Sequence, residues 1–214
     1  MRQRLIAEVF GTFSLVFAGT GAIVVDDTFG HVTHVGIALT FGLIVAAMIY
    51  SLGEVSGSHM NPAVSLGLCV AGRFAWRDLA PYALAQVAGA FLASGLLHLM
   101  FPEHDKLGAT LPSGPDLQSW AMEFVLTLIL MVVVMGVVSG SSATGAFAGV
   151  AIGSAIALEA LFAGPVSGAS MNPVRSLAPA VVSGHIERLW IYLSAPVAGA
   201  VAGVGVWRLM EGPE

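Results

Sequence analysis

The most constraining feature of this chain is an Asn-Pro segment that occurs twice. Residues 56–66 (SGSHMNPAVSL) and 167–177 (SGASMNPVRSL) are identical at seven of eleven positions, and Asn61 and Asn172 lie 111 residues apart. Proline suits the first turn of a helix, where its missing N–H has no partner to lose, and asparagine is a favourable cap before it. Each copy therefore predicts a loop that runs directly into a short helix.

The rest of the sequence predicts a membrane protein. Of its 214 residues, 57% are hydrophobic and only 10% are charged, whereas soluble domains carry about 25% charged residues. A helix needs about 20 apolar residues to cross a bilayer. The first of the six stretches that meet this need is interpreted as mature structure and not as a cleaved signal peptide. Six stretches are long and apolar enough. They are approximately 4–25, 34–54, 79–101, 116–138, 146–163 and 187–209, with the fifth having the least certain limits because it contains Glu159.

Charge distribution predicts the orientation. Six spans place Arg2, Arg4, Arg73, Arg77 and Arg208 on the side of the N-terminus, whereas the other side carries Lys106, Arg188 and six acidic residues. Because cytoplasmic loops are enriched in Lys and Arg, we expect a multi-pass protein of the plasma (inner) membrane with both termini cytoplasmic. No basic cluster indicates nucleic-acid binding. The single Cys69 excludes an intrachain disulfide, and we expect neither a metal nor a cofactor.

The two halves resemble each other beyond the Asn-Pro segments. Glu8 in the first span corresponds to Glu123 in the fourth, and residues 86–90 (QVAGA) correspond to 196–200 (PVAGA). Three spans per half is an odd number, so the second half must enter the membrane from the opposite side. The predicted fold is therefore an all-α membrane protein, with six transmembrane helices and two re-entrant half-helices in an inverted repeat. It forms one channel domain over 1–214, with repeats of approximately 1–105 and 116–214.

Small residues and aromatic residues complete the predicted architecture. Glycines spaced by four permit close helix packing, as at Gly145, Gly149 and Gly153, and again at Gly199 and Gly203. Tryptophan and tyrosine residues near span ends are interpreted as anchors at the membrane interface. They are Trp76, Trp120, Trp190, Tyr82 and Tyr192.

Two half-helices that point at one place would create a selective pore. Their N-termini carry partial positive charge and free N–H groups, which oppose the passage of protons and other cations. Asn61 and Asn172 would offer amide N–H donors to a passing neutral solute. Acceptors would be carbonyl groups of the non-helical residues before each half-helix, which are Gly57, Ser58, His59, Ser167, Gly168 and Ala169.

These features together resemble the major intrinsic protein family, the aquaporins and aquaglyceroporins. The resemblance covers nearly the whole chain and rests on six spans, paired glutamates and two boxes, Asn61-Pro62-Ala63 and Asn172-Pro173-Val174. It implies a homotetramer with one pore per subunit, and that Glu8 and Glu123 support the re-entrant loops. It also implies a narrow filter of four residues, which are Phe41, Ala160, Ala169 and Arg175.

The filter residues and the second box predict the solute. Water-selective members of the family usually carry histidine and a small polar residue or cysteine where this chain has Ala160 and Ala169, so we expect a wider and less polar constriction. Val174 replaces the usual alanine of the second box and should perturb packing there, as in plant nodulin-26-like channels and bacterial arsenic-operon channels. Ser176 replaces the aspartate of enteric glycerol facilitators. The expected solutes are arsenous acid, boric acid or glycerol, besides water.

Several alternatives stay open. A water-selective aquaporin is the nearest, and a proton-coupled transporter that uses Glu8 and Glu123 as carriers is more distant. An intramembrane serine protease would need Ser170 and His59 to act as nucleophile and base, which no feature supports, so we expect no enzyme. Glu159 has no counterpart in the first half and is expected to face a neighbouring helix or the loops.

Overall fold

The computed structural model describes residues 1–140 and 145–211, and within these ranges every regular element is a helix. Six helices are long and apolar enough to cross a membrane, which confirms the predicted fold class. They are α1 (Arg2–Phe29), α2 (Thr33–Ser56), α4 (Trp76–Met100), α5 (Asp116–Ser139), α7 (Ala148–Ser167) and α9 (Leu189–Glu211). The fifth span ends later than predicted, because α7 continues through Pro165 to Ser167. The predicted repeat 116–214 extends over both undescribed segments.

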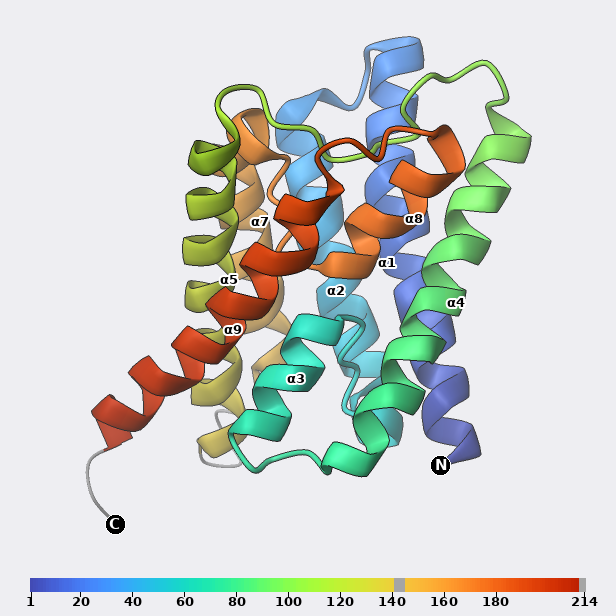
Figure 1. The fold of residues 1–214 in the computed structure, drawn as a ribbon. Coiled ribbons are helices and arrows are strands. Elements are labelled where there is room, and N and C mark those ends of the chain that lie inside the picture. Colours follow the sequence, from blue (N-terminus) through green and yellow to red (C-terminus); the bar gives the residue numbers. More distant parts are fainter. Residues whose placement is uncertain (141–144, 212–214) are drawn as a thin grey trace.

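Two short helices lie between the long ones. They are α3 (Pro62–Val70) and α8 (Pro173–Ser183), and each begins at the proline of an Asn-Pro box. Figure 1 shows α3 in the lower half of the molecule, on the side of the N-terminus, and α8 in the upper half. Neither is long enough to span a bilayer of about 30 Å, so each enters from one face and stops inside.

Helix packing repeats from one half to the other. Helix α1 packs against α2 and α4, and α5 packs in the same way against α7 and α9. Each half-helix contacts a long helix of its own half and one of the other half: α3 lies against α4 and α9, and α8 lies against α9 and α4. Figure 1 shows this interlocked arrangement. The half-helices are therefore enclosed by protein, which satisfies non-helical backbone at membrane depth.

Close packing at glycine brings the long helices together. A side chain at Gly199 or Gly203 of α9 would collide with the backbone of α5, and one at Gly149 would meet Tyr50 and Ala46 of α2. The predicted packing role is confirmed for these three positions and for Gly153, where a Cβ would come within 2.5 Å of the Gly42 carbonyl oxygen. It is wrong for Gly145, since no heavy atom of the described residues lies within 4 Å of where its Cβ would be.

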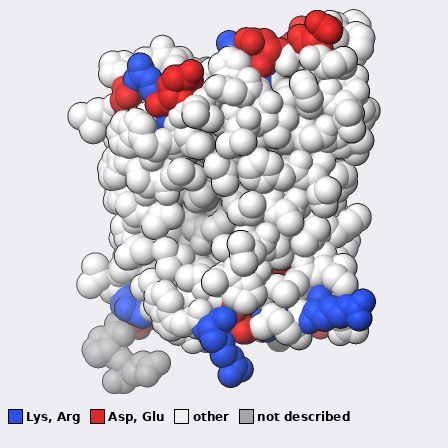
Figure 2. Space-filling view, turned by 45° about the vertical axis from the view of Figure 1, so that its right-hand side comes forward, with Lys and Arg blue, Asp and Glu red and all other residues white. Residues whose placement is uncertain are grey.

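Charged side chains gather at the two ends of the molecule. Figure 2 shows a wide uncharged band between an upper end, where acidic residues predominate, and a lower end, where basic residues predominate. The band is covered by exposed apolar side chains such as Leu43, Leu84, Leu92 and Leu158. Such a surface suits the hydrocarbon interior of a bilayer, where charged side chains are costly.

Candidate functional site

The two asparagines of the Asn-Pro boxes bridge the halves of the chain. Asn61 Nδ2 donates to the carbonyl of Met171 at 2.7 Å, and Asn172 Nδ2 donates to the carbonyl of Met60 at 2.9 Å. The Oδ1 of each asparagine caps its own half-helix by accepting from Ala63 N–H at 2.9 Å or from Val174 N–H at 3.2 Å. An amide nitrogen carries two hydrogens, so each asparagine keeps one donor beyond its bond to the opposite loop.

The loops before the half-helices adopt the left-handed backbone conformation at equivalent positions. In the first loop φ is 84° at Gly57, 50° at Ser58 and 51° at Met60, and the second loop repeats this pattern. Non-glycine residues are disfavoured in this region, so surrounding contacts must hold the loops in place. The corresponding values in the second loop are 89° at Gly168, 43° at Ala169 and 53° at Met171.

Two buried glutamates provide those contacts. Glu8 accepts from Ser56 Oγ–H at 2.8 Å and from the backbone N–H groups of His59 and Met60 at 2.9 and 2.8 Å. Glu123 makes the same three bonds in the other half, to Ser167, Ser170 and Met171, at 2.7–2.8 Å. These are the bonds that the predicted loop supports would make. The oxygens of both carboxylates already accept hydrogen bonds from the loops, so these contacts give no support to the alternative in which the glutamates carry protons.

Two tyrosines complete the loop supports, and here the sequence analysis was wrong. Tyr82 and Tyr192 are fully buried, so neither anchors the membrane interface. Tyr82 Oη–H donates to the carbonyl of Ser56 at 2.9 Å, and Tyr192 Oη–H donates to that of Ser167 at 2.7 Å. A signal was available, since each tyrosine lies four residues before one of the two matching segments that begin at positions 86 and 196.

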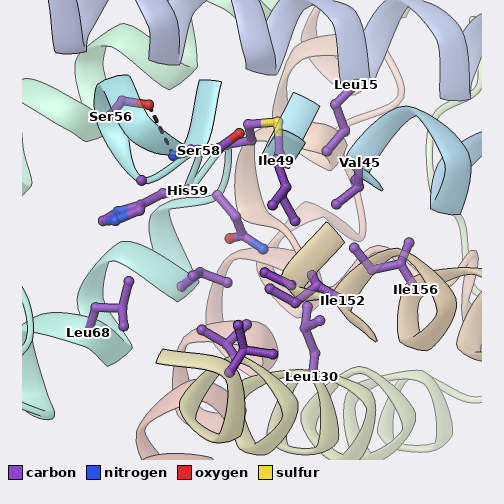
Figure 3. A pocket seen from close by; sticks show the side chains of 18 of the residues that line it. Leu15, Val45, Ile49, Ser56, Ser58, His59, Leu68, Leu130, Ile152 and Ile156 are labelled. Carbon is purple, nitrogen blue, oxygen red and sulfur yellow. Dashed lines mark hydrogen bonds between the residues drawn. The ribbon is translucent and has the colours of Figure 1, made fainter. Parts of the chain in front are cut away.

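One elongated cavity of about 720 Å³ runs along the half-helices and their loops. Figure 3 shows its interior, with Ser58 and His59 projecting from the first loop and aliphatic side chains on the opposite walls. The polar wall holds both asparagines and the residues around them. The apolar walls come from several helices and were not singled out in the sequence, since any buried face of a span is apolar; they include Leu15, Val45, Ile49, Val64, Leu130, Val134, Ile152 and Ile156.

The predicted carbonyl acceptors along the pore differ from the observed lining in the second half. Gly57, Ser58 and His59 border the cavity, whereas on the second loop the bordering residues are Ala169, Ser170 and Met171. Ser167 does not border the cavity, and its carbonyl accepts from Tyr192. Gly168 instead faces Thr110, where a Cβ would come within 2.8 Å of the threonine methyl.

All four residues of the predicted filter border the cavity. The guanidinium carbon of Arg175 lies 4.9 Å from the centre of the Phe41 ring, a cation–π distance. Ala160 and Ala169 line the same cavity and are each 7% exposed. Gly19 of α1 makes room for this arrangement, because any side chain there would overlap the Phe41 ring.

Arg175 is held by a segment that the sequence analysis did not identify. Its Nη1–H donates to the carbonyl of Gly108 at 2.8 Å, and Thr110 Oγ1–H donates to Ser176 Oγ at 2.7 Å. Gly108 and Thr110 both belong to the segment between α4 and α5, and through these two bonds the segment contacts α8. Arg175 is only 2% exposed, and its Nε–H has no partner in the part of the chain that the structure describes. A buried donor without a partner is costly, so this side chain is held in place by its bond to Gly108 at an energetic cost at Nε.

Two further residues singled out in the sequence, Val174 and Glu159, lie outside the cavity lining. Val174 does not border the cavity, and it packs with Leu15, Phe41 and Met60 in a buried cluster. Valine in place of the usual alanine therefore leaves the hydrogen bonds of Asn61 and Asn172 to the opposite loops intact. Glu159 is 1% exposed, faces away from the cavity, and neither of its oxygens has a hydrogen-bond partner among the described residues.

The protease alternative receives no support from the loop side chains. His59 Nδ1 lies 3.0 Å from Ser65 Oγ, and Ser170 Oγ bonds to the Asn172 carbonyl and to Ser176. The two residues are therefore engaged with separate partners. Within the described ranges, no group of three or more His, Cys, Asp or Glu residues is arranged to hold a metal ion.

An inverted repeat of six spans, with two capped half-helices meeting beside a narrow cavity, defines a membrane channel. The major intrinsic protein family matches residues 1–207. Aquaporin NIP1-4 of Oryza sativa subsp. japonica is 52% identical over 210 residues, which cover 98% of this chain and 77% of that protein. Nodulin-26 of Glycine max is 45% identical over 211 residues, which cover 98% of this chain and 78% of that one.

A solved structure agrees with these relatives. The X-ray structure of the aquaglyceroporin from Plasmodium falciparum superposes with a TM-score of 0.85 at 26% sequence identity, covering 96% of this chain and 95% of that chain. The chain therefore belongs to the major intrinsic protein family. It is a multi-pass membrane protein and a channel for small uncharged solutes and water.

Proposed function

We propose that this channel conducts arsenous acid and glycerol as well as water, and excludes protons and ions. The observation that carries the proposal is the pair of alanines, Ala160 and Ala169, which border the cavity beside Arg175 and Phe41. Alanine is the smallest side chain beyond glycine and presents no polar group. Two alanines leave more space and a less polar wall than histidine and a polar side chain would, which supports passage of a solute larger than water.

The chemistry of the lining suits neutral polyhydroxy solutes. Arg175 and the asparagines offer donors, and the carbonyls of the two loops that border the cavity offer acceptors. Ala160, Ile152 and Ile156 lie on the apolar side. Glycerol and arsenous acid each carry three hydroxyl groups and no charge, so one side of the solute can form hydrogen bonds while the rest contacts apolar side chains. The name of the solved relative, an aquaglyceroporin, supports the same choice.

Proton exclusion is proposed from the opposed half-helices. Helices α3 and α8 begin at Pro62 and Pro173, close to the reciprocal bonds of the asparagines. Each N-terminus carries roughly half a positive charge, and both act at the same depth. Asn61 and Asn172 present donors only, because their oxygens are used as caps. A water molecule between them must accept both bonds, which interrupts a proton-conducting chain of waters.

Swelling of proteoliposomes tests the proposed solutes. Vesicles that contain the purified channel are mixed with isotonic glycerol or arsenous acid, and light scattering records the entry of solute. The proposal expects entry well above that of empty vesicles, without dependence on a proton gradient. Permeability to water alone would establish the water-selective alternative. Uptake that collapses when the proton gradient is removed would favour the transporter alternative.

Orientation and assembly are also proposals. The basic end of the molecule carries the N-terminus (Figures 1 and 2), and the positive-inside rule supports cytoplasmic termini in the plasma (inner) membrane. A homotetramer with one pore per subunit is proposed from family membership. Reaction of single introduced cysteines with an impermeant reagent tests the first proposal, and light scattering of the detergent-solubilised protein tests the second.

A further inference from the structure

His104 lies in the segment between α4 and α5, on the face opposite the start of α1 and the end of α9 (Figure 1). Its Nδ1 accepts a hydrogen bond from Leu107 N–H at 3.0 Å, and its Nε2 lies 3.3 Å from the carboxylate of Asp27 at the end of α1. A backbone N–H can only donate, so Nδ1 must be unprotonated and the ring proton must sit on Nε2. The ring is thus neutral here, with one nitrogen facing each partner.

The Leu107 N–H belongs to a turn that needs support. Leu107 has φ of 49° and Gly108 has φ of 72°, so two consecutive residues are left-handed, and the first is not glycine. Leu107 is 1% exposed, and a Cβ at Gly108 would come within 2.8 Å of Thr20. This tight turn against α1 directs the Gly108 carbonyl toward Arg175, which donates to it at 2.8 Å.

A short chain of contacts therefore joins the outer surface to the proposed filter. His104 accepts from Leu107, and the next residue, Gly108, accepts from Arg175. We propose that His104 is a positioning residue for Arg175, and that a second proton on its ring releases the turn and narrows the channel. The inference rests on the proposed filter at Arg175, but it does not depend on which solute passes.

The physical step is the loss of one acceptor. A second proton would occupy Nδ1 and face the Leu107 N–H directly, so two donors would oppose each other. The turn would then lose a hydrogen bond while keeping its strained backbone. If the Gly108 carbonyl moves away, Arg175 keeps a buried charge without that acceptor. Arg175 borders the cavity beside Phe41, Ala160 and Ala169, so the released guanidinium moves into the constriction, where water can accept from it.

Other charged groups surround His104 and shape its response. Asp27 faces the ring from α1, and Glu103, Asp105 and Lys106 line the same surface hollow from its own segment. His185, between α8 and α9, lies 3.7 Å from the carboxylate of Asp105. Because His185 is a second titratable ring at this face, the test must alter His104 and leave His185 in place.

The experiment measures permeability of proteoliposomes to water and to glycerol at about pH 7.5 and about pH 5, a range in which histidine changes its charge. Losing one hydrogen bond changes the ratio of closed to open turns by about fivefold. We therefore expect both permeabilities of the wild-type channel to fall severalfold at the lower pH, glycerol more than water. Neither solute changes its own charge over this range.

Two variants distinguish the role of His104 Nδ1 as an acceptor from the role of the ring as a bulky side chain. In His104→Asn the amide oxygen can take the place of Nδ1 as an acceptor but does not titrate, so permeability should stay high at both pH values. In His104→Phe the ring remains without nitrogen, so permeability should be low at both. A wild-type channel that does not respond to pH, or a His104→Asn channel that responds as the wild type does, overturns the inference. Absence of glycerol flux at about pH 7.5 would contradict only the proposed solutes, since water permeability still reports the response.

Discussion

Gly42 of α2 and Gly153 of α7 pack directly against each other where the two halves of the chain meet. A Cβ at Gly153 would come within 2.5 Å of the Gly42 carbonyl oxygen and 2.9 Å of the Ala46 Cβ, and a Cβ at Gly42 would meet the Gly153 carbonyl in return. The same helices carry Phe41 and Ala160 of the proposed filter. The width of the pore at that level therefore depends on how closely these two glycines let α2 and α7 approach.

We predict that Gly153→Ala lowers stability and also alters flux. The new methyl group collides with backbone, which cannot rotate away, and overpacking of this kind costs about 1–3 kcal/mol. The thermal unfolding midpoint in detergent should fall by several degrees. Gly95→Ala is the matched control, because a Cβ at Gly95 meets no heavy atom of the described residues within 4 Å. Equal midpoints for both variants would contradict the packing argument.

Much of this fold could be predicted because a membrane imposes simple rules. A span must be long and apolar, so the six spans were evident from the sequence. The duplication then related the halves, because Glu8 and Glu123 are rare charged residues in apolar surroundings at equivalent positions. The Asn-Pro boxes predicted where the half-helices begin, because asparagine caps a helix and proline suits its first turn.

What could not be predicted depends on contacts between segments that share no pattern. Gly108 contacts Arg175 through a backbone carbonyl, and every residue has one, so no residue type signals it. Tyr82 and Tyr192 were misinterpreted because tyrosine near a span end is ordinarily an interface residue. Only the three-dimensional structure shows that both turn inward to the loops.

The buried tyrosines give a prediction in which the two halves test each other. Tyr192→Phe removes the donor to the Ser167 carbonyl, and Tyr82→Phe removes the donor to the Ser56 carbonyl. Each should cost about 1–2 kcal/mol, since a buried carbonyl loses its partner. Unfolding in detergent measures both, with Tyr50→Phe as control because that side chain is exposed. A loss confined to one half would show that the loops are not equivalently supported.

Two buried glutamates should respond in opposite ways to the same substitution. Glu123→Gln places an NH₂ group opposite donors that now point at a carboxylate, and should destabilise the protein by roughly 2 kcal/mol. Glu159→Gln removes a carboxyl group that accepts no hydrogen bond from the described residues, and should leave the unfolding midpoint unchanged or raise it. Both side chains are at most 1% exposed, so burial does not distinguish them. A larger loss for Glu159→Gln would mean that it has a role the contacts do not reveal.

The proposed filter gives the most direct prediction about flux. Ala160→His together with Ala169→Thr adds volume and polar groups on two sides of Arg175, so glycerol and arsenous acid should be rejected on steric grounds. Discrimination against a solute by pocket size is on the order of tenfold or more, whereas water needs less space and should be largely spared. Stopped-flow light scattering of proteoliposomes measures all three permeabilities. Ala121→Thr on α5 is the control, because that side chain is exposed and lies away from the cavity. Unchanged glycerol and arsenous acid entry in the double variant would show that the constriction lies elsewhere in the pore.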